Sequence, residues 1–165
     1  FYVFFAMRVC TRRVRILGVT PNPHRLFMKQ QALELAAFDD SLLRGCTHLI
    51  IDRDTKYTDE FREILKAEGI EPVLIPPSAP NCNTYAERFV RSIRNESLDR
   101  LILFGESALR RTLREYERHF LAERNHQGLE NKLIEPECGL QIRTGAVKCR
   151  ERLGGLLCYY FRDAA

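Results

Sequence analysis

The chain has 165 residues, of which 45% are hydrophobic and 29% are charged, so it is long enough and apolar enough to bury a core. No stretch approaches the roughly 18 apolar residues of a membrane span, and no basic leader precedes the apolar opening residues, which argues against a membrane protein and a signal peptide. The net charge of +4 is too mildly basic to select a partner by itself.

Two strand patterns open the chain. Residues 1–7 are rich in Phe and Val, and residues 11–20 carry several β-branched side chains, so both ranges are expected to be strands. The chain begins with Phe rather than Met, and we expect its first strand to be truncated at the start. After a Pro-rich turn, residues 26–38 lack Gly and Pro and are expected to be helical. One face of that helix is expected to carry Leu26, Gln30, Leu33 and Ala37.

Helices and strands then alternate. Residues 48–52 are a short apolar run typical of a central strand, and Thr58 followed by two acids is typical of a helix N-terminus. Residues 72–75 predict a second short strand, and the Pro-rich residues 76–81 predict a loop. A further helix is expected over residues 84–96.

The last third of the chain contains one more helical pattern and a distinct tail. A helix is expected from a cap at Ser107 to about Glu123, followed by a connection to Pro136. Residues 140–165 are expected to form two strands joined by a turn at a Gly-Gly pair. The order of elements predicts an α/β fold, with residues 1–136 as a core and residues 137–165 as a β-rich appendage.

The six cysteines are scattered through the chain. None form a C-x-x-C pair, and none stand at zinc-finger spacing with a histidine. Single thiols without a secretory leader indicate a reducing, cytoplasmic location. Most of these cysteines are expected to be small core residues.

Two carboxylates form the main candidate site. Asp52 follows the apolar run at 48–51, and Glu87 lies in the first turns of the predicted helix at 84–96. A strand end and a helix start can converge, and two converging carboxylates suit a hard divalent cation. Each residue also has a plainer interpretation: Asp-Arg-Asp is good turn chemistry, and Thr84-x-x-Glu87 is a capping box.

Basic residues cluster at two places. No acidic residue precedes Glu34, whereas several arginines do, and a block of one sign suits a polyanion such as a nucleic-acid backbone. Arg88, Arg91 and Arg94 recur along one helix edge beside Glu87, where they could contact phosphates. The alternative for both groups is a solvated surface, with the helix arginines pairing to nearby acids.

Several motifs carry a resemblance to a known family. The central ones are Asp52-Arg53-Asp54-x-Lys56-Tyr57, Pro76-Pro77-x-x-Pro80-Asn81 and Tyr85-Ala86-Glu87-Arg88-Phe89. Weaker matches lie at residues 11–14, 18–23, 123–129 and 152–160. In order and spacing these motifs resemble the DDE integrases and transposases of bacterial insertion sequences, relatives of retroviral integrase. The resemblance implies a ribonuclease H-like fold, with a mixed central sheet flanked by helices.

The resemblance also implies a function and a site. Asp52 corresponds to the second catalytic aspartate and Glu87 to the catalytic glutamate, and both would bind metal. The family cleaves and joins DNA phosphodiesters with two divalent cations, Mg²⁺ or Mn²⁺. The implied partners are DNA and further copies of the chain on DNA, and no membrane. The residues expected to contact DNA are Arg12, Arg13, Lys56, Arg88, Arg91 and Arg94.

The chain departs from the family pattern at its first strand. The first catalytic aspartate normally precedes a Thr-Arg or Ser-Arg pair by three residues, and here that position, counted from Thr11, is Arg8. A guanidinium has no lone pair for a metal and stays positively charged. We therefore expect DNA integration and strand transfer to be severely weakened or absent. The alternatives are an inactive relative that binds DNA or pairs with an intact subunit, and the remnant of a decayed mobile element.

Overall fold

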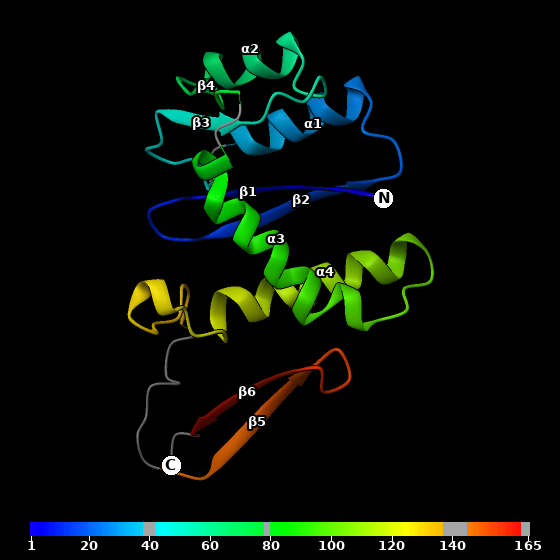
Figure 1. Cartoon of the computed structure of the whole chain (residues 1–165), viewed down its shortest axis with the longest axis vertical. Coiled ribbons are helices and arrows are strands. Elements are labelled where there is room, and N and C mark those ends of the chain that lie inside the picture. The colour runs from blue at the N-terminus through cyan, green and yellow to red at the C-terminus, as the bar shows by residue number, and fades with distance from the viewer. Residues whose placement is uncertain (38–41, 78–79, 137–144, 163–165) are drawn as a thin grey trace. The chain divides into compact units, whose positions relative to one another are not determined.

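The structure is a computed structural model that describes residues 1–37, 42–77, 80–136 and 145–162. The chain divides into two units, the first made of residues 1–10 and 14–88 and the second of residues 11–13 and the chain from residue 89 onward. Figure 1 shows the elements in chain order. No helix among the described residues is long and apolar enough to cross a bilayer.

The first unit opens with an antiparallel strand pair, β1 (Tyr2–Met7) and β2 (Val14–Thr20). This confirms both expected strands, although the second begins at Val14. Gly18 lies where β2 closely approaches the next helix, because a Cβ there would meet Gln31 Oε1 at 2.6 Å. Only glycine fits at that point of the strand without displacing its neighbours.

A parallel strand pair follows, formed by β3 (His48–Ile51) and β4 (Glu71–Leu74). They are joined by α2 (Asp59–Ala67), which makes a βαβ unit. Thr58 caps α2 as expected, because its side chain accepts a hydrogen bond from the Phe61 amide at 3.3 Å. Phe61 and Leu65, both fully buried, form the inner face of α2.

Helix α1 (Arg25–Ala36) is present as expected, but the face expected for it is wrong. Leu26 is 72% exposed and Leu33 is 46% exposed. The sequence contains a second stripe at helical spacing, and packing selects that one. The buried side chains of α1 are Met28, Gln31, Ala32 and Leu35. Three of them, Met28, Ala32 and Leu35, join a core with Ala6, Leu42, Leu43, Ile51, Phe61, Leu65 and Ile70.

The described strands form three separate two-stranded sheets. The alternation of helices and strands confirms a mixed α/β protein. The expected mixed central sheet is not confirmed, because β1 pairs only with β2 and β3 only with β4 in the described part of the chain.

The second unit is built on two helices. Helix α3 (Thr84–Glu96) continues into it from the first unit, and α4 (Gly105–Ala122) packs against α3 through aromatic rings. The Phe89 and Phe120 rings meet edge to face, with centroids 5.0 Å apart. Phe104, not Ser107, occupies the N-cap position of α4, so the expected cap is wrong.

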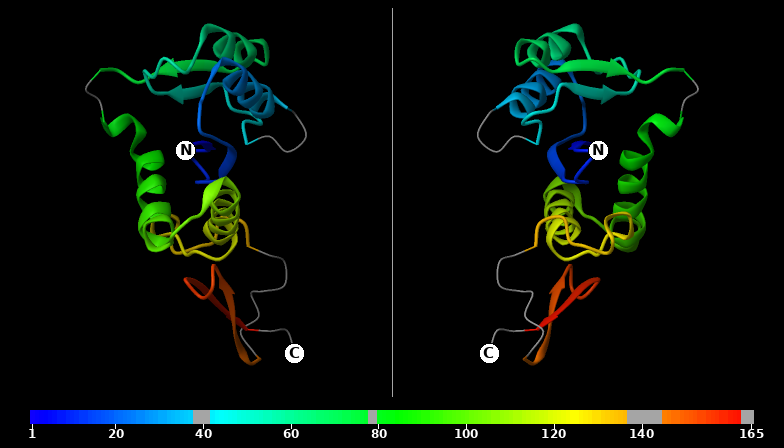
Figure 2. Two further views of the ribbon diagram at one scale, coloured as in Figure 1. Left: turned by 90° about the vertical axis from the view of Figure 1, so that its right-hand side faces the viewer. Right: turned by 90° about the vertical axis from the view of Figure 1, so that its left-hand side faces the viewer.

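A C-terminal hairpin completes the second unit. It is the antiparallel pair β5 (Val147–Arg152) and β6 (Leu157–Arg162), which Figure 2 shows as a two-stranded ribbon. The two expected tail strands are therefore confirmed. The expected boundary between residues 136 and 137 stays a prediction, because residues 137–144 lie outside the described ranges.

Candidate functional site

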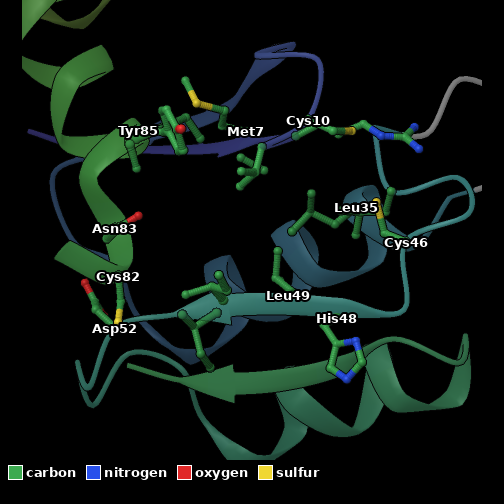
Figure 3. Close-up of a pocket in the computed structure, with 18 of the residues that line it drawn as sticks. Met7, Cys10, Leu35, Cys46, His48, Leu49, Asp52, Cys82, Asn83 and Tyr85 are labelled. Carbon is green, nitrogen blue, oxygen red and sulfur yellow. The ribbon is translucent and has the colours of Figure 1, made fainter. Parts of the chain in front are cut away.

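A cavity of about 580 Å³ in the first unit contains the predicted aspartate. Its walls come from residues 4–10, from the end of α1, from residues 45–52 and from the start of α3. In Figure 3, Asp52 lies toward Cys82 and Asn83, the residues that lead into α3. The cavity therefore brings together the strand end and the helix start on which the predicted site depends.

Asp52 leaves the sheet directly after the buried Ile51. Its Oδ1 accepts a hydrogen bond from the Asp54 backbone amide at 3.0 Å, which is the turn chemistry that the plainer interpretation expected. Arg53 Nε donates to the Ile75 carbonyl at 2.8 Å, which holds the turn against the end of β4. The Asp52 side chain is thus oriented by its own loop and remains exposed.

Asp54 and Lys56 form an ion pair within the loop that follows β3. The Lys56 amide also donates to Asp54 Oδ1 at 3.0 Å. The hydrogen bonds from Lys56 lower the pKa of Asp54, and the same pairing raises the pKa of Lys56. Lys56 Nζ also lies 4.8 Å from the Tyr2 ring centroid. The positive charge of Lys56 is therefore largely neutralised by Asp54.

Tyr57 supports the loop from the core side. Its ring contacts the Phe61 ring at 5.2 Å and the Phe4 ring at 6.3 Å between centroids. Burial, followed by the charges of Asp52 and Asp54, raises the pKa of Tyr57. The phenol therefore stays protonated beside the carboxylates. Sequence reasoning assigned Tyr57 no role, although it closes the motif that begins at Asp52.

Glu87 lies in the first turn of α3 and is exposed. The two residues before it, Tyr85 and Ala86, line the same cavity as Asp52. Among the described residues, no cluster of three metal-ligating side chains includes Asp52 or Glu87. The structure thus brings Asp52 to the segment that carries Glu87, and it supplies no third ligand beside them.

Arg8 follows the end of β1, whereas the start of β1 lies by the Asp52 loop. Tyr2 contacts Lys56, and residues 2–5 share a smaller cavity with Asp52 and Asp54 that Arg8 does not line. Along an extended strand, six residues span roughly 20 Å. Arg8 does line the larger cavity together with Asp52, so its placement at the position of the first catalytic aspartate stays a prediction.

The residues expected to contact DNA divide into paired and exposed groups. Arg94 lies 3.6 Å from Asp99, which matches the alternative in which the helix arginines pair with nearby acids. Arg13 pairs with Glu135. Arg12 adjoins Arg13 in a left-handed backbone conformation, with φ 63°. Arg88 and Arg91 are exposed on α3.

One family model matches the middle of the chain. Residues 68–133 match the family model described as an integrase core domain. The match confirms the family expected from the sequence and supports an integrase or transposase catalytic core of the ribonuclease H-like superfamily. A search of curated proteins finds no match.

The integrase core match covers less than half of the chain. It includes Glu87 and the arginines that follow it on α3, and it begins after Asp52. Glu87 thus lies inside the matched segment, whereas Asp52 lies before it and shares a cavity with the start of α3. The roles of both residues stay predictions.

Proposed function

We propose that this chain acts on DNA as an integrase or transposase core, with Asp52 and Glu87 as its metal-binding carboxylates. The observation that supports the proposal most is the shared cavity: Asp52 lines it together with Tyr85 and Ala86, directly before Glu87. The match of residues 68–133 to an integrase core domain supports the same class of function.

The donor set fits a hard cation in part. Carboxylate oxygens are the ligands that Mg²⁺ and Mn²⁺ prefer, and Asp52 offers an exposed, oriented carboxylate. When bound, a pair of such cations would activate the attacking water or 3′-hydroxyl and stabilise the leaving oxygen. Asp54, the nearest further acid in sequence, is paired with Lys56. Under this proposal, Asp52 and Glu87 would supply two of the three carboxylates that the family uses.

DNA would be held by charge rather than by the carboxylates. Arg88 and Arg91 are exposed on the helix that carries Glu87, so phosphates bound by them would lie near that carboxylate. Lys56, held by Asp54, would add little net charge. Assembly of several copies on DNA and a cytoplasmic location remain predictions.

We expect strand transfer by this 165-residue chain to be severely weakened, because a third carboxylate is not placed with Asp52 and Glu87 among the described residues. The substitution of Arg8 for the first catalytic aspartate stays a second expected cause, since Arg8 lines the same cavity as Asp52. A DNA-binding relative without catalysis is the second candidate, and the incomplete ligand set favours it.

A nicking assay on supercoiled DNA tests the proposal. The chain would be incubated with Mg²⁺ or Mn²⁺, alongside Asp52→Asn, Glu87→Gln and the exposed control Glu63→Gln. Salt-dependent DNA binding with slow, metal-dependent nicking that is lost in Asp52→Asn and Glu87→Gln alone supports the catalytic proposal. DNA binding without nicking supports the inactive relative, and the absence of both supports a decayed remnant.

A further inference from the structure

The C-terminal hairpin has two faces with different chemistry. Residues alternate along both strands, so one face turns toward α4 and the other toward solvent. The inner face carries Arg150, Arg152, Leu157, Tyr159 and Phe161, which are buried or half-buried. The outer face carries Cys149, Glu151, Cys158 and Tyr160, all exposed.

The strand register brings three of the outer residues together. Glu151 pairs directly with Cys158 across the ladder, and Cys149 stands two residues before Glu151 on the same face. The two thiol sulfurs and a Glu151 carboxylate oxygen all lie within 4.8 Å of one another. Three ligand atoms of this kind converge nowhere else among the described residues.

The presence of two cysteines here differs from the sequence-level expectation. Most cysteines were expected in the core, but Cys10, Cys82, Cys149 and Cys158 are exposed and Cys46 is half-buried. Cys138 lies outside the described residues. The sequence spacing of Cys149 and Cys158 matches no zinc-finger pattern, because a hairpin, rather than a knuckle or a helix, joins them.

We propose that Cys149, Cys158 and Glu151 form a binding site for a thiophilic divalent cation such as Zn²⁺, separate from the carboxylates proposed to act on DNA. Two thiolates and one carboxylate are ligands that Zn²⁺ uses, and three protein ligands leave a fourth position open to solvent. The sulfurs of a tetrahedral site with Zn–S bonds of about 2.3 Å stand about 3.8 Å apart. Small side-chain rotations from the observed spacing, below 4.8 Å, reach that geometry.

The hairpin itself is held firmly enough to present such a site. On the inner face, Arg152 donates to Glu123 at 2.7 and 2.9 Å and to Glu115 at 2.7 Å. Near the turn, Cys158 Sγ lies 3.3 Å from the Gly155 carbonyl. Backbone pairing and this anchor fix the spacing of the three ligands before any metal binds, which favours affinity.

Titration of the full chain with Cd²⁺ or Co²⁺ under reductant tests the site. Thiolate coordination produces a charge-transfer absorption band, and we expect one equivalent of metal per chain with displacement by Zn²⁺. Cys149→Ser and Cys158→Ser should each lose the band, and Cys10→Ser, an exposed cysteine outside the hairpin, should retain it. Glu151→Gln should weaken binding about tenfold or more, since even a lost outer-shell partner costs that much.

The contradicting outcomes are equally distinct. No band, a band that survives Cys149→Ser and Cys158→Ser, or unchanged affinity in Glu151→Gln would each overturn the three-ligand site. The proposal would also be overturned if the two thiols bind no metal under reductant and form only a disulfide when the reductant is removed. All three ligand residues are exposed, so these variants should keep the fold, which far-ultraviolet circular dichroism would verify.

Discussion

Arg152 and Glu123 join the C-terminal hairpin to helix α4 through two hydrogen bonds, 2.7 Å to Glu123 Oε1 and 2.9 Å to Glu123 Oε2. The Glu123 side chain is 1% exposed and the Arg152 side chain 13% exposed. Arg150 also donates a hydrogen bond to the Glu123 carboxylate, and His119 Nδ1 lies 3.1 Å from Glu123 Oε2. The buried Glu123 thus attaches the hairpin to α4, although the sequence predicted the hairpin only as an appendage.

Removing the charge of Glu123 should destabilise the chain. In Glu123→Gln, the buried guanidinium of Arg152 loses one of its two anionic partners and keeps only Glu115. Breaking a buried ion pair typically costs about 3 kcal/mol of unfolding free energy. Urea unfolding followed by circular dichroism measures the loss. The control Glu130→Gln removes the exposed partner of Lys132 and should cost less than about 1 kcal/mol. Equal losses in the two variants would contradict the role of Glu123.

Stability should also fall in acid through Glu123. Burial opposes ionisation of this carboxyl, but hydrogen bonds from Arg152 and His119 outweigh that effect and lower the pKa of Glu123. A lowered folded-state pKa contributes stability above the unfolded value of about 4.3, and that contribution disappears as the pH falls through the folded-state pKa. Unfolding free energy measured from pH 6 to pH 3 (roughly the carboxyl range) should drop less steeply in Glu123→Gln than in the parent. Identical slopes would refute this linkage.

Local patterns in the sequence predicted the elements that local chemistry controls. Thr58 before two acids indicated a helix start, and its hydroxyl does accept from the Phe61 amide. The apolar run at residues 48–52 predicted a strand, and β3 ends one residue earlier, at Ile51. Such features depend on neighbours a few residues away, so they can be recognised without the rest of the fold.

Long-range packing decided the features that the sequence did not predict. The buried face of α1 is the stripe with Met28 and Leu35 rather than the one with Leu26, because both stripes have helical spacing and only contact with the strands distinguishes them. The Glu123–Arg152 pair spans 29 positions. Convergence of Cys149 with Cys158 depends on the register of the β5–β6 hairpin, which no local pattern specifies.

The N-cap of α2 should contribute to the stability of the first unit. Thr58→Ala removes the acceptor of the Phe61 amide and should lower the unfolding free energy by about 1 kcal/mol. Thr58→Ser keeps a hydroxyl at the same position and should restore most of that stability. If Thr58→Ala and Thr58→Ser are equally stable, the hydrogen bond does not contribute.

DNA binding should depend on the exposed arginines of α3. Arg88→Gln combined with Arg91→Gln should weaken binding and reduce the dependence of log affinity on log salt by about two, one for each lost phosphate contact. Arg111→Gln, an exposed arginine on α4, is the matched control and should leave the salt dependence unchanged. Fluorescence anisotropy with a labelled duplex measures both quantities. An equal effect at Arg111 would indicate only a general charge attraction.

Binding of Mn²⁺ tests the shared site of Asp52 and Glu87 most directly. The titration is best made by calorimetry in a chain that carries Cys149→Ser and Cys158→Ser, so that the hairpin thiols do not compete. We predict binding that falls about tenfold or more in both Asp52→Asn and Glu87→Gln, and that is unchanged in Glu63→Gln. Binding that both site variants leave unaltered would show that these two carboxylates do not hold a metal together.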